Sequence, residues 1–120
     1  MGMHRRRDEP PARAELLNAL LAEYSSRPRL TNHLGTGWHM HFRDDNIAPD
    51  RQLAALITVG TAVHLTSRGM DRLGRCDADD CARVYADVSR NGRQRFCSAR
   101  CGNRATVRRH RARRAANYVN

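Results

Sequence analysis

Four cysteines in two close pairs constrain this chain more than any other feature. Four residues separate Cys76 from Cys81, three separate Cys97 from Cys101, and fifteen lie between the pairs. Such short spacings let one turn of backbone deliver two sulfurs to one ion, and Zn²⁺ favours tetrahedral sulfur or nitrogen ligands. Two disulfides, or four reduced thiols, are the alternatives to a metal. Four protein ligands would leave no open coordination position, so the pattern predicts one structural zinc ion.

The residues between and after the cysteine pairs predict a hairpin and a helix. Residues 84–87 suit a strand, Asn91-Gly92 is a strong hairpin-turn signal, and residues 93–96 suit the returning strand. The second cysteine pair then lies at the start of a helix over 98–116. A knuckle, a hairpin and a helix in this order are treble-clef-like. Zinc binding in small peptides is worth about 10–16 kcal/mol, so we expect this segment to unfold without metal.

The N-terminal region predicts a small α+β arrangement. Residues 1–10 read as a basic flexible tail, and Asp8, Glu9 and the prolines that follow suit the start of a helix over 11–25. A second helix is expected from Pro49 to about residue 67, with Asp50 as its N-cap and Gly69 as its stop. We interpret one apolar stripe of that helix as its core face, formed by Leu53, Leu56, Ile57, Gly60, Val63 and His64.

A hairpin is expected between these two helices, over residues 29–43, with its turn at residues 35–37. In its second strand Trp38, Met40 and Phe42 alternate with His39 and His41. Period two predicts the first three on a buried face and both histidines on the opposite, polar face. A metal role for the two histidines is disfavoured, because no third ligand has a suitable spacing nearby.

Charge is strongly segregated along the chain. The net charge is +10, yet residues 1–89 hold twelve arginines and twelve acids, while residues 90–120 hold ten arginines and no acid. A basic excess concentrated in one segment is typical of a protein that binds a polyanion. No apolar run approaches the roughly 18 residues of a membrane span, and no signal peptide is recognisable. We therefore expect a cytoplasmic protein with no membrane partner.

The run from Cys97 to Arg104, Cys-Ser-Ala-Arg-Cys-Gly-Asn-Arg, resembles the CGNR zinc finger, and residues 72–114 share the likeness. The resemblance implies metal ligation by the four cysteines and a signature formed by Gly102, Asn103 and Arg104. It also implies a DNA-binding module of bacterial, stress-induced transcriptional regulators. Residues 14–70 resemble, more weakly, the second half of the domain that usually precedes this finger. We therefore expect a shortened regulatory-type domain over 11–71 and the finger over 72–116.

We therefore expect a zinc-dependent protein that binds DNA through its C-terminal helix and associates with the nucleoid. The resemblance implies that it is a transcriptional regulator. The candidate contacts are Arg100, Arg104, Arg108, Arg109, Arg111, Arg113 and Arg114. Binding to structured RNA and a zinc-stabilised protein-interaction module, including a homodimer, are the alternatives. Within the signature, Gly102 is expected to permit close packing, Asn103 to hydrogen-bond a sulfur or the turn, and Arg104 to pair with Asp87 or contact phosphate. No catalytic residues are predicted, because no open metal site, phosphate-binding loop or nucleophile–base pair is present.

Overall fold

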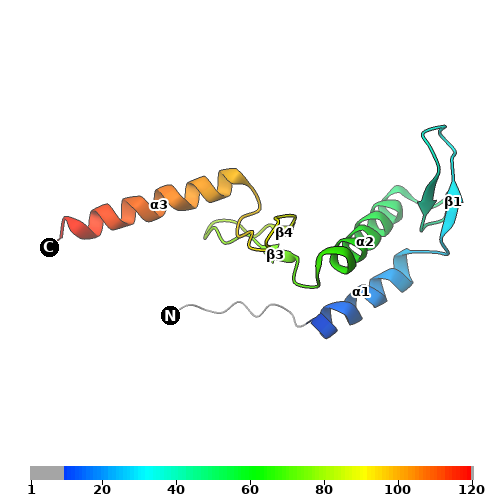
Figure 1. The fold of residues 1–120 in the computed structure, drawn as a ribbon, viewed down its shortest axis with the longest axis horizontal. Coiled ribbons are helices and arrows are strands. Elements are labelled where there is room, and N and C mark those ends of the chain that lie inside the picture. The colour runs from blue at the N-terminus through cyan, green and yellow to red at the C-terminus, as the bar shows by residue number, and fades with distance from the viewer. Residues whose placement is uncertain (1–9, 120) are drawn as a thin grey trace. The chain divides into compact units, whose positions relative to one another are not determined.

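A computed structural model describes residues 10–119. The chain forms two compact units, and the boundary between them along the sequence falls between Met70 and Asp71. Figure 1 shows the helices α1 and α2 with one hairpin in the first unit, and a second hairpin with the helix α3 in the second. Three helices and two small antiparallel sheets make the described chain α+β, which confirms the predicted class. None of the described helices is long and apolar enough to cross a membrane.

Helices α1 (Pro10–Tyr24) and α2 (Pro49–Arg68) pack against each other in the first unit. Both begin at proline, whose fixed φ suits the first helical turn. Arg51 of α2 donates to the carbonyl oxygen of Glu23 at 2.8 Å and lies over the Tyr24 ring, 5.2 Å from its centroid. These contacts join the end of α1 to the start of α2. Both predicted helices are confirmed; the expected helix-start residues Asp8 and Glu9 lie outside the described residues.

The ends of α2 differ in part from the prediction. Ala48, not Asp50, holds the N-cap position, and no side chain caps this helix. Asp50 lies in the first turn instead, where a negative charge still favours the helix dipole. Gly69 ends the helix at φ 126°, a conformation that favours glycine, and its N–H donates to the Leu65 carbonyl oxygen at 2.8 Å. The predicted stop is therefore confirmed and the predicted N-cap is wrong.

The buried face of α2 is not the predicted apolar stripe. Leu53, Leu56 and Ile57 are 55%, 69% and 59% exposed, whereas the buried residues of this helix are Ala55, Thr58 and Leu65. Small side chains let a neighbouring helix approach closely, and α1 is the helix that packs on α2. A single neighbour covers one side of a helix, so the wider apolar stripe is left outside the helix pair.

The hairpin of the first unit pairs β1 (Arg29–Thr31) with β2 (His39–His41) in antiparallel register, with Leu30 opposite Met40. Gly35 and Gly37 in the connection have φ of 63° and 107°, which favour glycine. The predicted alternation is present, but its faces are reversed. Trp38 and Met40 are 75% and 51% exposed, while both histidines are half-buried. Phe42 alone of the expected apolar face is partly covered.

The second hairpin pairs β3 (Leu73–Arg75) with β4 (Val84–Ala86), and the first cysteine pair lies in the connection between these strands. The predicted partner of β4, residues 93–96, forms no strand. That segment instead lies beside the knuckle, the turn over residues 76–81 that carries the first cysteine pair. There the Asp77 N–H donates to the Arg95 carbonyl oxygen at 2.9 Å. The hairpin therefore surrounds the first cysteine pair and does not connect the two pairs. The predicted partner of β4 is therefore wrong, and β3, which contains Gly74, carried no strand signal in the sequence.

Helix α3 (Ala99–Asn117) begins between the two cysteines of the second pair, so that Cys97 precedes the helix and Cys101 lies in its first turn. Ser98 is its N-cap, and the Ser98 hydroxyl accepts from the Cys101 N–H at 3.2 Å. This bond satisfies one of the amide donors that the first helical turn leaves unpaired. The cap therefore fixes the start of the helix and, with it, the position of Cys101 in the first turn.

Candidate metal centre and basic helix

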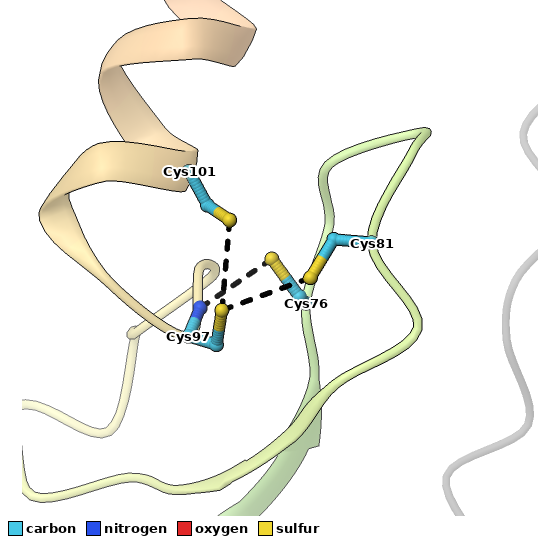
Figure 2. Close-up of side chains that lie close together, drawn as sticks. All are labelled: Cys76, Cys81, Cys97 and Cys101. Atoms are coloured by element: carbon cyan, nitrogen blue, oxygen red, sulfur yellow. Dashed lines mark hydrogen bonds between the residues drawn. The ribbon is translucent and has the colours of Figure 1, made fainter.

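The four cysteine sulfurs converge on one point, as Figure 2 shows. Cys97 Sγ lies 3.8 Å from Cys81 Sγ and 3.6 Å from Cys101 Sγ, and all four sulfurs lie within 4.8 Å of one another. Sulfurs 2.3 Å from a tetrahedral zinc ion stand about 3.8 Å apart. None of the four cysteines forms a disulfide in this structure, so the disulfide alternative is not adopted. The donor set and its spacing fit one structural zinc ion.

Local backbone structure delivers the first pair of sulfurs. The Cys76 N–H donates to the Arg83 carbonyl oxygen at 2.8 Å, which continues the ladder of the hairpin by one bond. The Cys81 N–H donates to the Ala78 carbonyl oxygen at 3.0 Å and closes a tight turn. Cys76 and Ala78 are 0% and 3% exposed and, with Cys101, form the buried cluster of this unit. The residues around the four sulfurs thus form both the metal site and the buried core of this unit.

The thiols have unequal electrostatic surroundings. Burial raises the pKa of Cys76, but backbone N–H groups of Cys97 and Ala78 outweigh it and bring the pKa to about 7. Burial and the neighbouring thiols together raise the pKa of Cys97 to about 11. A zinc ion would supply the positive charge that deprotonates all four. Four thiolates on Zn²⁺ carry a net charge of −2, so donors and cations around the sulfurs stabilise the centre.

Arg104 supplies such a cation. Its Nη2 lies 3.3 Å from Cys101 Sγ, and its Nε lies 3.1 Å from Asp80 Oδ2. Asp80, and then the sulfur of Cys101, raise the pKa of this guanidinium above its ordinary value. Arg108 reaches the same carboxylate at 3.3 Å. The expected pairing of Arg104 with Asp87 is wrong, since Asp80, next to a ligand in the knuckle, is its partner.

Of the two arginines that flank Cys101 in the first turns of α3, Arg100 and Arg104, only Arg104 contacts a cysteine sulfur. Arg100 is exposed, and within residues 10–119 it makes no contact with a cysteine sulfur.

Asp87 organises the segment that leads to the second cysteine pair. It is 4% exposed and accepts hydrogen bonds from the Ser89 N–H at 2.9 Å, the Ser89 hydroxyl at 2.5 Å and the Gln94 N–H at 3.2 Å. Burial raises the pKa of Asp87, but these donors and nearby Arg72 outweigh it and hold the pKa below its ordinary value. Arg72 Nη1 lies 3.6 Å from the carboxylate and donates to the Ser89 carbonyl oxygen. Sequence reasoning missed this role; the signal was a lone acid two residues before a serine in a turn.

The signature residues differ in what they touch. A Cβ on Gly102 would lie 3.3 Å from Phe96 Cδ2, so the expected close packing at this glycine is confirmed. Asn103 is exposed, and its side chain makes no hydrogen bond to a sulfur or to the turn within residues 10–119. The turn is held by Asp87 and by Asn91, whose side chain accepts from the Arg93 N–H at 3.2 Å.

The remaining basic residues of α3 are solvent-facing. Every residue over 106–117 is exposed, and this stretch contains no acid. Among the described residues, five predicted contacts form no ion pair with a carboxylate: Arg100, Arg109, Arg111, Arg113 and Arg114. A hollow of about 350 Å³ separates the start of this stretch from the knuckle, lined by Asp77, Asp80 and Arg109 among others. The helix is therefore anchored at its first turns and uncovered beyond them.

A knuckle within a hairpin, followed by a helix that carries the fourth ligand, defines a four-cysteine zinc finger. Residues 72–114 match the family model described as the CGNR zinc finger. This match covers the whole metal centre and most of α3, and confirms the resemblance seen in the sequence. No curated protein matches the chain.

Proposed function

We propose that the second unit binds DNA through the exposed arginines of α3, and that the chain acts as a transcriptional regulator. One observation carries the proposal: a helix without a single acid is anchored at one end by the cysteine cluster, while its residues 106–117 are all exposed. Within the described unit only Arg108 of this stretch forms an ion pair, with Asp80, so the positive charge of the other arginines is available to an approaching polyanion. DNA phosphates are the polyanion that such helices commonly contact.

The ion pairs divide the predicted contacts into two groups. Arg104 and Arg108 are held by Asp80 and serve the knuckle, so they are weaker candidates for phosphate binding. Arg109 and Arg113 lie four residues apart on one side of α3, and Arg111 and Arg114 lie three apart on another. Two separate rows suit a helix that lies along a groove between two phosphate backbones.

The test is DNA affinity across a salt series for zinc-loaded protein and a triple variant, Arg109→Gln, Arg111→Gln and Arg113→Gln. Glutamine keeps the helix propensity of arginine, so the helix should persist. Each lost phosphate contact reduces the slope of log K against log salt by about 0.9, so the triple variant should flatten it by about 2.7.

The matched control removes three charges from the first unit by Arg27→Gln, Arg43→Gln and Arg68→Gln. If net charge alone caused binding, both variants would lose the same slope. Equal losses, or no binding of the wild type at low salt with the cysteine site loaded, would overturn the proposal.

Duplex RNA in the same series tests the alternative polyanion. Helix α3 contains no Phe, Tyr or Trp, so it lacks the large aromatic rings on which unpaired bases commonly stack. This favours a duplex over a single strand. A steeper slope and tighter binding on RNA than on DNA would reassign the ligand while keeping the helix as the binding surface.

A further inference from the structure

The first unit holds a second cluster of metal-ligating side chains, on its hairpin. His39 and His41 lie in β2, and His33 lies in the connection that precedes it. One ligand atom from each of the three lies within 4.8 Å of the others. The ring centroids are 5.4, 5.1 and 4.9 Å apart in the three pairs. The turn through Gly35 and Gly37 brings the first histidine back over the second strand.

We propose that His33, His39 and His41 form a second metal site, which binds a divalent first-row transition ion of the zinc class through imidazole nitrogens. Imidazole suits Zn²⁺, Ni²⁺ and Cu²⁺. Three protein ligands leave a fourth position of a tetrahedral ion open to water or another small donor, unlike the closed four-cysteine centre. The site is independent of the zinc finger and of DNA binding.

The outer contacts of the rings carry the argument. His39 Nδ1 lies 2.9 Å from the Gly37 carbonyl oxygen, which can only accept, so Nδ1 carries the proton. His41 Nδ1 lies 3.4 Å from Asp45 Oδ1, and a carboxylate likewise accepts. In the neutral form of each ring, Nε2 therefore presents a lone pair.

Those two lone pairs face each other. His39 Nε2 and His41 Nε2 are 3.1 Å apart, and two acceptors at this distance repel unless a cation lies between them. Nitrogens 2.0–2.1 Å from a tetrahedral ion stand about 3.3 Å apart, close to the observed separation. A metal ion satisfies both lone pairs and adds the third ring. The other source of positive charge is one extra proton shared by the pair.

Outer partners of this kind are typical of histidine ligands. A ligating ring commonly donates its second N–H to a carboxylate or a backbone carbonyl, and the loss of that partner costs about 10–100-fold in metal affinity. Asp45 is itself held by an ion pair with Arg29 of β1. His33 Nδ1 contacts the Thr31 hydroxyl at 3.2 Å. All three rings are thus oriented by a second contact, from the hairpin itself or, for His41, from the loop that follows it.

A groove of about 480 Å³ borders the site. It is lined by His39 and His41 on the hairpin and by Leu53, Leu56 and Val59 of α2. The apolar stripe of α2 that is left outside the helix pair therefore forms one wall beside the histidines. This groove gives the open coordination position a low-polarity neighbour.

The experiment counts metal in the full chain by native mass spectrometry and titration with Zn²⁺ and Co²⁺. We expect two ions per wild-type chain, and one for the His39→Ala, His41→Ala double variant. The control His110→Ala removes an exposed histidine of α3 and should keep two. Cobalt distinguishes the sites, because only the cysteine centre gives an intense thiolate-to-metal charge-transfer band.

Two single variants guard against loss of the hairpin. His33→Ala removes a ligand outside both strands and should weaken the second ion by more than 100-fold. Asp45→Asn should weaken it by about 10–100-fold, the range for an outer partner. One ion per wild-type chain in excess metal, or a second ion unaffected by these variants, would overturn the proposal and leave a shared proton as the cation.

Discussion

The two units of this chain are stabilised by different kinds of interior. In the first unit two helices bury a few side chains against each other, chiefly Ala55 and Leu65, and leave many apolar residues exposed. In the second unit the most buried side chains are ligands, with Cys76 0% and Cys101 6% exposed, and the apolar contribution is small. Small chains commonly replace a missing core by a metal. The comparison suggests that metal removal acts on one unit and leaves the helix pair of the other.

Removal of the second cysteine pair should produce the largest effect. In the Cys97→Ser, Cys101→Ser variant the knuckle loses two of four ligands, and we expect the second unit to unfold with a loss on the order of 10 kcal/mol of metal-linked stability. Circular dichroism should show loss of helix equivalent to α3 and retention of α1 and α2. A variant that keeps full helicity without bound zinc would contradict the metal-built interior.

Asp87→Asn should be the largest effect among residues that do not bind metal. Asp87 is a buried carboxylate that accepts three hydrogen bonds and pairs with Arg72, so its neutralisation breaks a buried ion pair, at a cost of about 3 kcal/mol. Thermal melts of zinc-loaded protein measure the loss. Asp77→Asn is the control: its ion pair with Arg95 is solvent-exposed and is worth less than about 1 kcal/mol. Equal losses of stability in the two variants would show that Asp87 contributes no more to folding than an exposed ion pair.

Glycine replacement contrasts the packing of the units. A Cβ on Gly74 would lie 2.6 Å from Tyr85 Cζ and Oη, so Gly74→Ala must displace the ring and its hydrogen bond to the Gln94 carbonyl oxygen. We expect a loss of about 1–3 kcal/mol. Gly60 in α2 has nothing within 4 Å of a Cβ, so Gly60→Ala should stabilise by about 0.5–1 kcal/mol. Chemical denaturation of each variant checks both signs, and a gain at Gly74 would show that the second unit is loosely packed.

Helix caps give the smallest difference. Ser98→Ala removes the hydroxyl that accepts from the Cys101 N–H, and should destabilise α3 by about 1 kcal/mol. Helix α2 has no side-chain cap, so Ala48→Ser should stabilise it by about 0.5–1 kcal/mol. The same denaturation measurements compare the two. Unchanged zinc affinity in Ser98→Ala would limit the role of the cap to the helix and exclude it from ligand positioning.

Local signals correctly predicted that the four cysteines come together and that three helices form. Cysteine spacing, prolines, Gly69 and helical periodicity act within a few residues, and each corresponds to a local structure that forms in the same place. The glycine at position 102 was also interpreted correctly, because Phe96 packs on the helix at that point.

Long-range partners were predicted less well. The Asn91-Gly92 turn favoured a strand over 93–96, but β4 pairs with β3, which periodicity did not reveal. The faces of β2 and α2 were assigned from apolarity alone, and only the position of α1 and the hairpin decides which side is covered. His33 was overlooked because its approach to His39 depends on the turn, although three histidines flanking a glycine-rich turn were a usable signal.

Hydrogen exchange of the full chain with and without zinc, read by mass spectrometry, tests the central contrast most directly. Upon metal removal we expect amide protection to be lost over residues 72–112 and to persist in α1 and α2. Any loss of protection in the first unit should be confined to the histidine hairpin. Protection that survives over β3, β4 and the first turns of α3 would contradict the account, because it would show that the second unit folds without its metal.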